Sequence, residues 1–240
     1  MSEPERPSAP GFVRLSLARH PGALPDAFVL PFEPGAADAA RFASFGIACP
    51  PSIERSVGKR RAEYLAGRRA AVAALREAGS TANDLAIGVS RAPSWPAGFT
   101  GSITHADGLA AAVAMPAAGL RGVGIDLEHA VSASALEAIV QTVIDAAERE
   151  ALAGLAGRVG WPTACTIAFS AKESFYKATA AEVGRIFEFS ALRIVGVDTD
   201  GDVVVAEVAE PLASSLPVGK VFRMGFSPVG TLSVLTSCAW

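Results

Sequence analysis

Helix-like and strand-like segments are mixed along this chain of 240 residues without a regular alternation of the two. The strongest helical segment, residues 59–78, is rich in Ala, Leu, Arg and Glu, and Gly79 follows it at a natural C-terminal stop. A second long helix is expected over residues 164–181. Parallel sheets need regular crossovers between strands, so this order predicts an α+β fold with antiparallel sheet.

Shorter elements complete the predicted layout, with a break at Pro50-Pro51 and a joint at residues 117–119 that separates halves 1–118 and 119–240. Residues 1–10, rich in Pro and Ser, are expected to be a disordered tail. The other predicted helices are 36–45, 134–143 and 146–153, and the predicted strands are 85–89, 100–105, 109–115, 123–127, 192–197, 203–208, 221–226 and 231–237.

Composition excludes several classes of protein. Half of the residues are hydrophobic, yet the longest apolar stretch, roughly residues 109–120, is interrupted by Pro116 and is shorter than the ~20 residues of a membrane span. The start of the chain has no apolar run of the kind a secretory signal carries. The three cysteines form no disulfide or metal pattern, and a net charge of −3 gives no global basic field for nucleic acid. We therefore expect a cytoplasmic protein that binds neither nucleic acid nor membrane.

Two acids lie two residues apart in the apolar strand at residues 123–128. Because side chains alternate along a strand, Asp126 and Glu128 point to the same face. They are consistent with a solvent-facing strand surface, which is common in antiparallel sheet, or with a metal site. The apolar residues Val123, Ile125 and Leu127 favour an inner strand whose other face is buried.

A further acid and two lysines lie in the second long helix. Glu173 and Lys177 are four residues apart and so share a helical face, with Lys172 beside them. An exposed pair of this kind would contribute only ~0.2–0.5 kcal/mol to helix stability. Three aromatic residues within residues 169–177 indicate instead that this helix is half-buried. Together with the strand acids, the segment suggests a hard cation that holds a phosphate-bearing substrate.

Basic residues earlier in the chain could form a phosphate-binding site. Arg60 and Arg68 are eight apart and fall on roughly one face of the first long helix, and Arg91 in a nearby loop could join them. His105 follows the small residues 101–104, whose backbone N–H groups could approach an anion. A solvated helix face and a structural histidine are the alternatives. The motifs of hydrolases, P-loop proteins and Rossmann folds are absent from the sequence.

Four segments of the chain, taken together and in their order along the sequence, resemble the 4′-phosphopantetheinyl transferases, most closely the surfactin- and enterobactin-synthetase branch. The resemblance runs from residue 59 to about residue 180, and Thr104 stands where many relatives have serine. The four segments are residues 60–68 (RRAEYLAGR), 95–105 (WP through GSITH), 124–128 (GIDLE) and 169–177 (FSAKESFYK).

This resemblance implies two similar α/β halves related by a pseudo-twofold in one chain, with coenzyme A in the cleft between them. It implies transfer of the phosphopantetheine arm from coenzyme A to a serine of an acyl or peptidyl carrier protein, with release of 3′,5′-ADP. A monomer is expected, since a chain that contains both halves has its cleft without a partner. By similarity, Mg²⁺ would be held by Asp126, Glu128 and Glu173. Coenzyme A phosphates would be contacted by Arg60, Arg68, Arg91 and His105, and the pyrophosphate or its developing charge by Lys172 and Lys177.

The roles implied for the catalytic pair leave alternatives open. Glu173 or a metal-bound water takes the proton from the carrier serine, and Lys177 offsets charge on the leaving group. A coenzyme A-binding module without catalysis and a metal-dependent phosphodiesterase are the other function classes. The sequence leaves the carrier open among siderophore peptide synthetases, polyketide synthases and fatty-acid synthesis.

Overall fold

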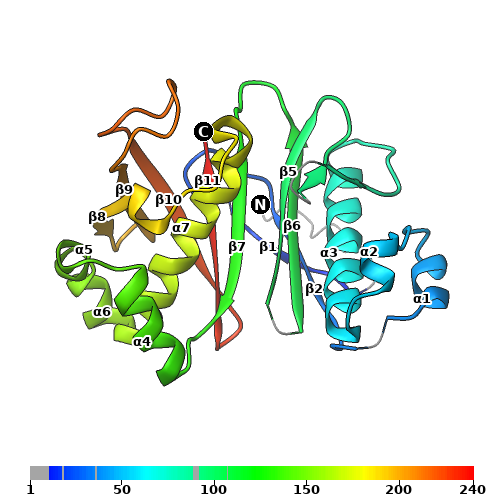
Figure 1. Cartoon of the computed structure of the whole chain (residues 1–240), viewed down its shortest axis with the longest axis horizontal. Helices are drawn as coiled ribbons and strands as arrows, with labels where there is room; N and C mark the ends of the chain where they lie inside the picture. The colour runs from blue at the N-terminus through cyan, green and yellow to red at the C-terminus, as the bar shows by residue number, and fades with distance from the viewer. Residues whose placement is uncertain (1–10, 18, 36, 89–91, 107) are drawn as a thin grey trace, which may run out of the picture.

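The computed structural model describes residues 11–17, 19–35, 37–88, 92–106 and 108–240 (Figure 1). The predicted tail at residues 1–10 and the predicted phosphate contact Arg91 lie outside these ranges. Helices and two antiparallel sheets make up the fold, which confirms the predicted α+β class. No helix in the described ranges is both long and apolar enough to cross a bilayer.

Each sheet is antiparallel throughout the pairings described. The four-stranded sheet has the order β1 (Val13–Leu15), β2 (Ala27–Pro31), β6 (Leu109–Pro116), β5 (Phe99–Ala106). The five-stranded sheet has the order β7 (Val123–His129), β11 (Ser233–Ala239), β10 (Val221–Val229), β9 (Val203–Val208), β8 (Leu192–Asp198). A small hairpin pairs β3 (Ala86–Ile87) with β4 (Pro93–Ser94).

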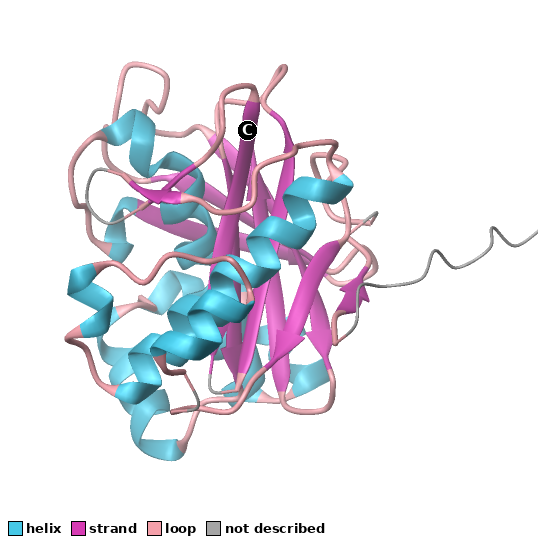
Figure 2. Cartoon of the chain, turned by 90° about the vertical axis from the view of Figure 1, so that its right-hand side faces the viewer, coloured by secondary structure: helices cyan, strands magenta, loops and turns pink. Residues whose placement is uncertain are grey.

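One long helix, α3 (Gly58–Glu77), covers the four-stranded sheet, and Figure 2 shows helices crossing in front of the strands on this side. Its sheet-facing residues are mostly alanine and leucine, and they pack on Phe28 and on the alanines of β6. A Cβ on Gly67 would lie 2.9 Å from the Ile103 side chain, so the helix is seated close to β5. Two short helices, α1 (Ala39–Ser44) and α2 (Pro51–Glu54), flank α3.

The second long helix, α7 (Trp161–Val183), packs on β7 and β11 of the five-stranded sheet. Its buried face joins a core with side chains of β8, β9 and β10, in which Phe175 stacks edge-on against Phe222 with ring centroids 4.8 Å apart. Four short elements complete this half: α4 (Ala133–Thr142), α5 (Ala146–Ala151), α6 (Ala153–Val159) and the 3₁₀ turn η2 (Phe189–Ala191).

Two local predictions were wrong. The helix predicted over residues 146–153 is two helices, α5 and α6, because the chain turns at the fully buried Leu152. The Pro50-Pro51 break begins α2, since Pro51 at the first helical position supplies the right φ and has no N–H to leave unpaired.

The two sheets meet along β5 and β7, which stand side by side in the centre of Figure 1. The described sheet pairings contain no backbone ladder between them. Instead, the Ser102 hydroxyl accepts a hydrogen bond from the N–H of Ile125 at 3.0 Å, and the Thr104 hydroxyl accepts one from the N–H of Leu127 at 3.0 Å. Two side chains of β5 thus satisfy the exposed backbone edge of β7. We call this contact the hydroxyl seam.

The loop between β1 and β2 ties the halves together a second time. Leu17 and Leu24 from this loop are buried in one cluster with Ile125 and Leu127 of β7. His20 reaches further, to the five-stranded sheet, where its ring nitrogens lie 2.6 Å from the Ser237 hydroxyl and 2.8 Å from the Ser227 hydroxyl. The division predicted between residues 118 and 119 falls between β6 and β7, and the pseudo-twofold relation of the halves stays a prediction.

Buried His20 is expected to make the protein acid-sensitive. Burial lowers the pKa of His20 from 6.5 to about 4, with Asp202 opposing the shift. Between these values the unfolded chain binds a proton that the folded chain does not, so stability falls as the pH drops from 6.5 to 4, by up to ~3 kcal/mol. Urea unfolding at several pH values between about 4 and 6.5 checks this loss of stability. His20→Gln should flatten the pH dependence, and an unchanged slope in that variant would contradict the assignment.

Candidate active site

The face of β7 that carries the acids is also the face on which α7 rests. Along this face lie Gly122, Gly124 and Asp126 at alternate positions. A Cβ on Gly122 would lie 1.9 Å from the carbonyl oxygen of Ala178, and one on Gly124 would lie 2.0 Å from that of Ser174. Glycine is therefore required for backbone-to-backbone contact, and the close approach brings α7 alongside the following acid.

Hydroxyl groups fix α7 on the sheet next to these glycines. The Ser170 and Ser174 hydroxyls lie 2.9 Å and 2.7 Å from the Thr236 hydroxyl of β11. The Ser170 hydroxyl also donates to the carbonyl of Asp126 at 3.3 Å. Since these groups are buried and hydrogen-bonded, they define the rotation of α7 and turn Glu173 and Lys177 toward the centre of the molecule.

The close seat of α7 gives a direct stability prediction. Gly124→Ala would force a methyl group against backbone, so we expect a loss of about 3 kcal/mol and a fall in Tm of roughly 10 °C. Gly154→Ala is the matched control, because a Cβ there meets nothing within 4 Å and alanine favours the α6 helix. Thermal melts of the two variants decide the point, and equal Tm values would contradict it.

Asp126 is the centre of the candidate site. Its side chain is almost fully buried, and its Oδ1 accepts hydrogen bonds from Lys177 Nζ at 2.6 Å and from the Thr104 hydroxyl at 3.1 Å. Lys177 also donates to the carbonyl of Ile125 at 3.2 Å. By contrast, Asp126 Oδ2 is buried and has no hydrogen-bond partner among the described residues. An orphaned carboxylate oxygen is costly to bury, and a cation would satisfy it.

Glu173 lies near Asp126 on the adjoining turn of α7. Burial raises the pKa of the Glu173 carboxyl above its ordinary value, and the negative charge of Asp126 raises it further, while Lys177 opposes the shift. Two carboxylates that repel each other in a poorly hydrated position are a common arrangement both for a bound cation and for a group that accepts a proton.

The four-stranded half supplies a basic edge to the same place. Arg60 of α3 places Nη1 3.0 Å from Nε2 of His105 on β5. Glu63, one helical turn after Arg60, lies 3.5 Å from Arg60 and 3.9 Å from the other ring nitrogen of His105. Burial lowers the pKa of His105, and Glu63 opposes the shift; the charges of Lys177 and Asp126 also act on it. His105 therefore connects the basic edge to the Asp126 centre.

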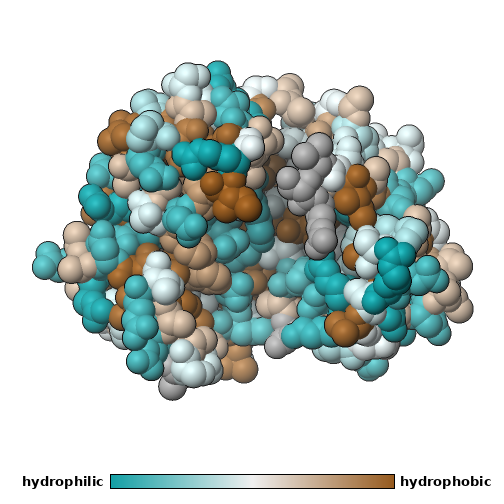
Figure 3. Space-filling view, viewed as in Figure 1, coloured by the Kyte–Doolittle hydropathy of each residue, from teal (hydrophilic) through white to brown (hydrophobic). Residues whose placement is uncertain are grey.

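The predicted site residues are thus partly brought together. Arg60, His105, Asp126, Glu173 and Lys177 converge where β5, β7, α3 and α7 meet. In the space-filling view, the surface is hollowed between the two halves, with hydrophilic side chains on both sides (Figure 3). The structure therefore places charged groups from both halves at one junction.

Two predicted residues, Arg68 and Lys172, lie away from the junction. The guanidinium of Arg68 is buried 4.9 Å from the ring centroid of Tyr64, with its nearest oxygen partner the Ala86 carbonyl at 3.5 Å. Lys172 points away from Asp126 and forms a 2.7 Å ion pair with buried Glu148. Glu128, two positions after Asp126 on β7, is partly buried, and its role as a metal ligand stays a prediction.

The predicted three-carboxylate metal site is not preassembled. Within the ranges described, no three or more His, Cys, Asp and Glu side chains form a group that could hold a metal ion. At Asp126, Oδ1 is paired with Lys177 Nζ at 2.6 Å. The residues still fit a divalent cation, because Asp126 Oδ2 is buried with no hydrogen-bond partner among the described residues and a second carboxyl group, that of Glu173, lies close enough to feel its charge.

Sequence reasoning missed three residues that shape this site. Glu63 balances Arg60 and His105, and its position three residues after Arg60 on a helix was the available signal. Ser102 and Thr104 belong to a segment that was singled out for its small residues, not for its hydroxyls. Their partners are backbone N–H groups over twenty residues away, a pairing that only the tertiary fold reveals.

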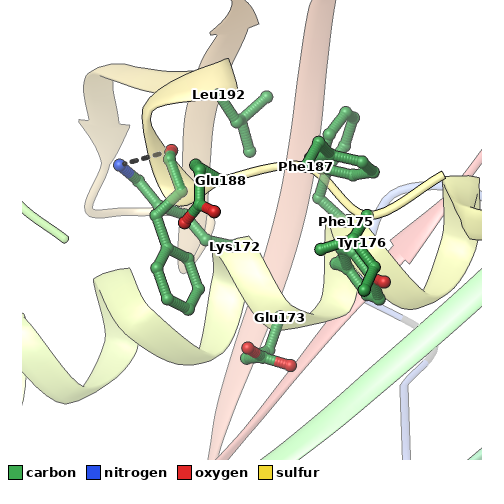
Figure 4. A pocket seen from close by; sticks show the side chains of 9 residues that line it. Lys172, Glu173, Phe175, Tyr176, Phe187, Glu188 and Leu192 are labelled. Atoms are coloured by element: carbon green, nitrogen blue, oxygen red, sulfur yellow. Dashed lines mark hydrogen bonds between the residues drawn. The ribbon is translucent and has the colours of Figure 1, made fainter. Parts of the chain in front are cut away.

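A pocket of about 210 Å³ opens beside Glu173, between α7 and the segment that leads into β8. Figure 4 shows Phe175, Phe187 and Tyr176 grouped at one end of the pocket, with Leu192 and Lys172 at the other. The Tyr176 and Phe187 ring centroids are 4.8 Å apart. The pocket is thus largely apolar and borders the charged junction at Glu173.

Two family models match this chain. The model of the 4′-phosphopantetheinyl transferase N-terminal domain matches residues 50–115, and the model of the 4′-phosphopantetheinyl transferase superfamily matches residues 122–210. Together they cover more than half of the chain, including every described residue of the charged junction.

Curated relatives agree with these matches. The chain is 45% identical over 130 residues to enterobactin synthase component D of Salmonella typhi, covering 54% of this chain and 53% of that protein. It is 36% identical over 162 residues to the 4′-phosphopantetheinyl transferase Svp of Streptomyces mobaraensis, covering 66% and 63%. It is 34% identical over 149 residues to the 4′-phosphopantetheinyl transferase Npt of Nocardia iowensis, covering 62% and 65%. The chain spans about half the length of the enterobactin synthase relatives it matches.

Proposed function

Because this chain belongs to the 4′-phosphopantetheinyl transferase superfamily, we propose that it transfers the phosphopantetheine arm of coenzyme A to a carrier protein. The acceptor is a serine of an acyl or peptidyl carrier, and the second product is 3′,5′-ADP. The observation that carries this proposal is the junction where Asp126, Glu173 and Lys177 face a basic edge from the other half.

In the proposed reaction, the serine oxygen bonds to the phosphorus that carries the pantetheine arm. The bond from that phosphorus to the bridging oxygen breaks, and 3′,5′-ADP leaves with the electron pair. The serine proton passes to the carboxylate of Glu173, whose raised pKa suits a proton acceptor. Lys177, part-buried beside Asp126, offsets negative charge on the leaving phosphate.

Magnesium is part of this proposal. Asp126, Glu128 and Glu173 would hold Mg²⁺, which when bound would neutralise charge on the pyrophosphate. Lys177 would then give up its place on Asp126 Oδ1 and turn to the phosphate. Arg60 and His105 would bind the phosphates of coenzyme A from the other side of the junction. Arg68 and Arg91 remain proposed contacts, and for Arg68 this requires the guanidinium to leave its buried position.

The apolar pocket fits the other end of coenzyme A. The pantetheine arm is a long, uncharged chain with a dimethyl group, and aromatic residues Tyr176 and Phe187 suit such a chain. The pocket borders Glu173, so an arm lying there would start next to the reacting phosphate.

The deciding experiment mixes the protein with coenzyme A, Mg²⁺ and a panel of apo carriers, and follows the carrier mass. The names of the relatives make carriers of enterobactin-type synthetases the first choice for the panel. A gain of one phosphopantetheine group per carrier, with release of 3′,5′-ADP, is the expected result. Release of 3′,5′-ADP without a carrier would indicate a phosphodiesterase, and binding of coenzyme A without product would indicate a binding module.

A further inference from the structure

Lys172 lies at a buried junction of four segments. Its side chain is 2% exposed, and its ammonium group donates to Glu148 Oε1 at 2.7 Å. It also donates to the carbonyls of Val143 at 2.7 Å and Phe189 at 3.3 Å. All three N–H groups of the ammonium therefore have acceptors within the protein, and none is left for a ligand.

Glu148 is as fully engaged as Lys172. Its Oε1 accepts a further hydrogen bond from the N–H of Ile194 at 2.8 Å, and its Oε2 accepts one from the N–H of Asp145 at 2.9 Å. The second bond closes the capping box that begins α5. A buried carboxylate with three such contacts is strongly restricted in position.

This buried pair holds the wall of the apolar pocket. The stem of Lys172 lines the pocket, and Figure 4 shows its nitrogen bonded to a backbone oxygen of the segment opposite, which is that of Phe189. Glu148 accepts a hydrogen bond from the N–H of Ile194. The pair is therefore hydrogen-bonded to the pocket wall both before and after Leu192 in the sequence. The next residue on α7 after Lys172 is Glu173. One buried ion pair thus sets the distance between the pocket wall and the proposed base.

We infer that Lys172 and Glu148 form a positioning pair that sets the pocket wall for the pantetheine arm, and that Lys172 does not bind phosphate. This inference rests on the proposed function, because it concerns how coenzyme A lies in the site. It also replaces the phosphate contact expected for Lys172 from the sequence.

Coenzyme A and 3′-phosphoadenosine 5′-diphosphate separate the two roles, since both carry the 3′-phosphate and both phosphates of the pyrophosphate, but only coenzyme A carries the arm. Calorimetry measures Kd for each with the full-length protein and with Glu148→Gln, Lys172→Met and the double variant. We expect each single change to weaken coenzyme A binding about tenfold or more, with Kd for 3′-phosphoadenosine 5′-diphosphate within about twofold of the parent value. Exposed Glu150→Gln on α5 is the matched control and should change neither Kd.

Two outcomes would overturn the inference. One is a tenfold loss of affinity for 3′-phosphoadenosine 5′-diphosphate in Lys172→Met that is absent in Glu148→Gln, which would make Lys172 a phosphate contact. The other is unchanged coenzyme A affinity in both single variants. The double variant, with a neutral pair of similar shape, guards against unfolding of the single ones and should still lose the preference for coenzyme A.

The proposed function is judged separately, from the parent protein. If the parent binds coenzyme A but transfers nothing to any carrier, the proposed function fails, and the ratio of the two Kd values still decides the role of Lys172. A folded parent that binds coenzyme A no more tightly than 3′-phosphoadenosine 5′-diphosphate would refute the pocket as the place for the arm and the inference with it.

Discussion

Asp126→Asn is expected to lower the rate of phosphopantetheine transfer by about 10³-fold or more and to leave the fold in place. Asn keeps the shape and still accepts hydrogen bonds from Thr104 and Lys177, but it removes the charge that a divalent ion needs. A bound ion stabilises charge in phosphoryl transfer by several kcal/mol, and ~4 kcal/mol corresponds to about 10³ in rate. Initial rates at saturating coenzyme A and varied Mg²⁺ measure the effect.

The control for Asp126→Asn is Asp198→Asn, which makes the same chemical change at an exposed carboxylate paired with Arg223. It should transfer at the parent rate. Circular dichroism and a thermal melt establish that the Asp126 variant is folded at the assay temperature. A folded Asp126 variant with the parent rate and the parent Mg²⁺ dependence would rule out the proposed metal site.

Glu173→Gln is expected to reduce kcat by about 10²–10⁴-fold, the usual contribution of a general base. Gln has nearly the same size but cannot accept the serine proton. If Glu173 is the base, the remaining activity should lose the rise with pH that the parent shows through the raised pKa of this group. A pH–rate profile with the same ascending limb in parent and variant would assign the proton transfer elsewhere, such as to a metal-bound water.

The same variant carries a second readout, because it should be more stable than the parent at neutral pH without a divalent ion. Burial and the charge of Asp126 raise the pKa of Glu173, so the folded state holds this proton more tightly than the unfolded state. Stability of the parent therefore falls as the pH rises from about 4.5 through the raised pKa, and Gln removes this loss. This dependence has the opposite sign to that of His20, so unfolding curves distinguish the two groups.

The sequence predicted the elements and the charged residues better than it predicted their partners. The long helices and most strands follow from periodicity and from Gly and Pro positions, as for residues 59–78, which are α3 within a residue at each end. Asp126, Glu173 and Lys177 were selected because strand and helix periods place side chains on shared faces, a local rule that survives folding.

Partners across the fold were beyond these local rules. Lys172 and Lys177 look alike in the sequence. In the structure, however, Lys172 forms a buried ion pair with Glu148, and Lys177 pairs with Asp126. The difference arises because α4, α5 and the turn before β8 pack on one side of α7 only. Similarly, the loop between β1 and β2 gave no sign that His20 would reach two serines more than 200 residues away.

The hydroxyl seam has a consequence for how such a protein changes over evolution. A backbone ladder would fix the spacing of β5 and β7 at a value common to all sheets, whereas the seam makes it depend on two short side chains. Threonine and serine at position 104 would both keep the hydroxyl. A change of one methyl group at this position can therefore adjust the width of the junction while the hydrogen bonds of both sheets stay as they are.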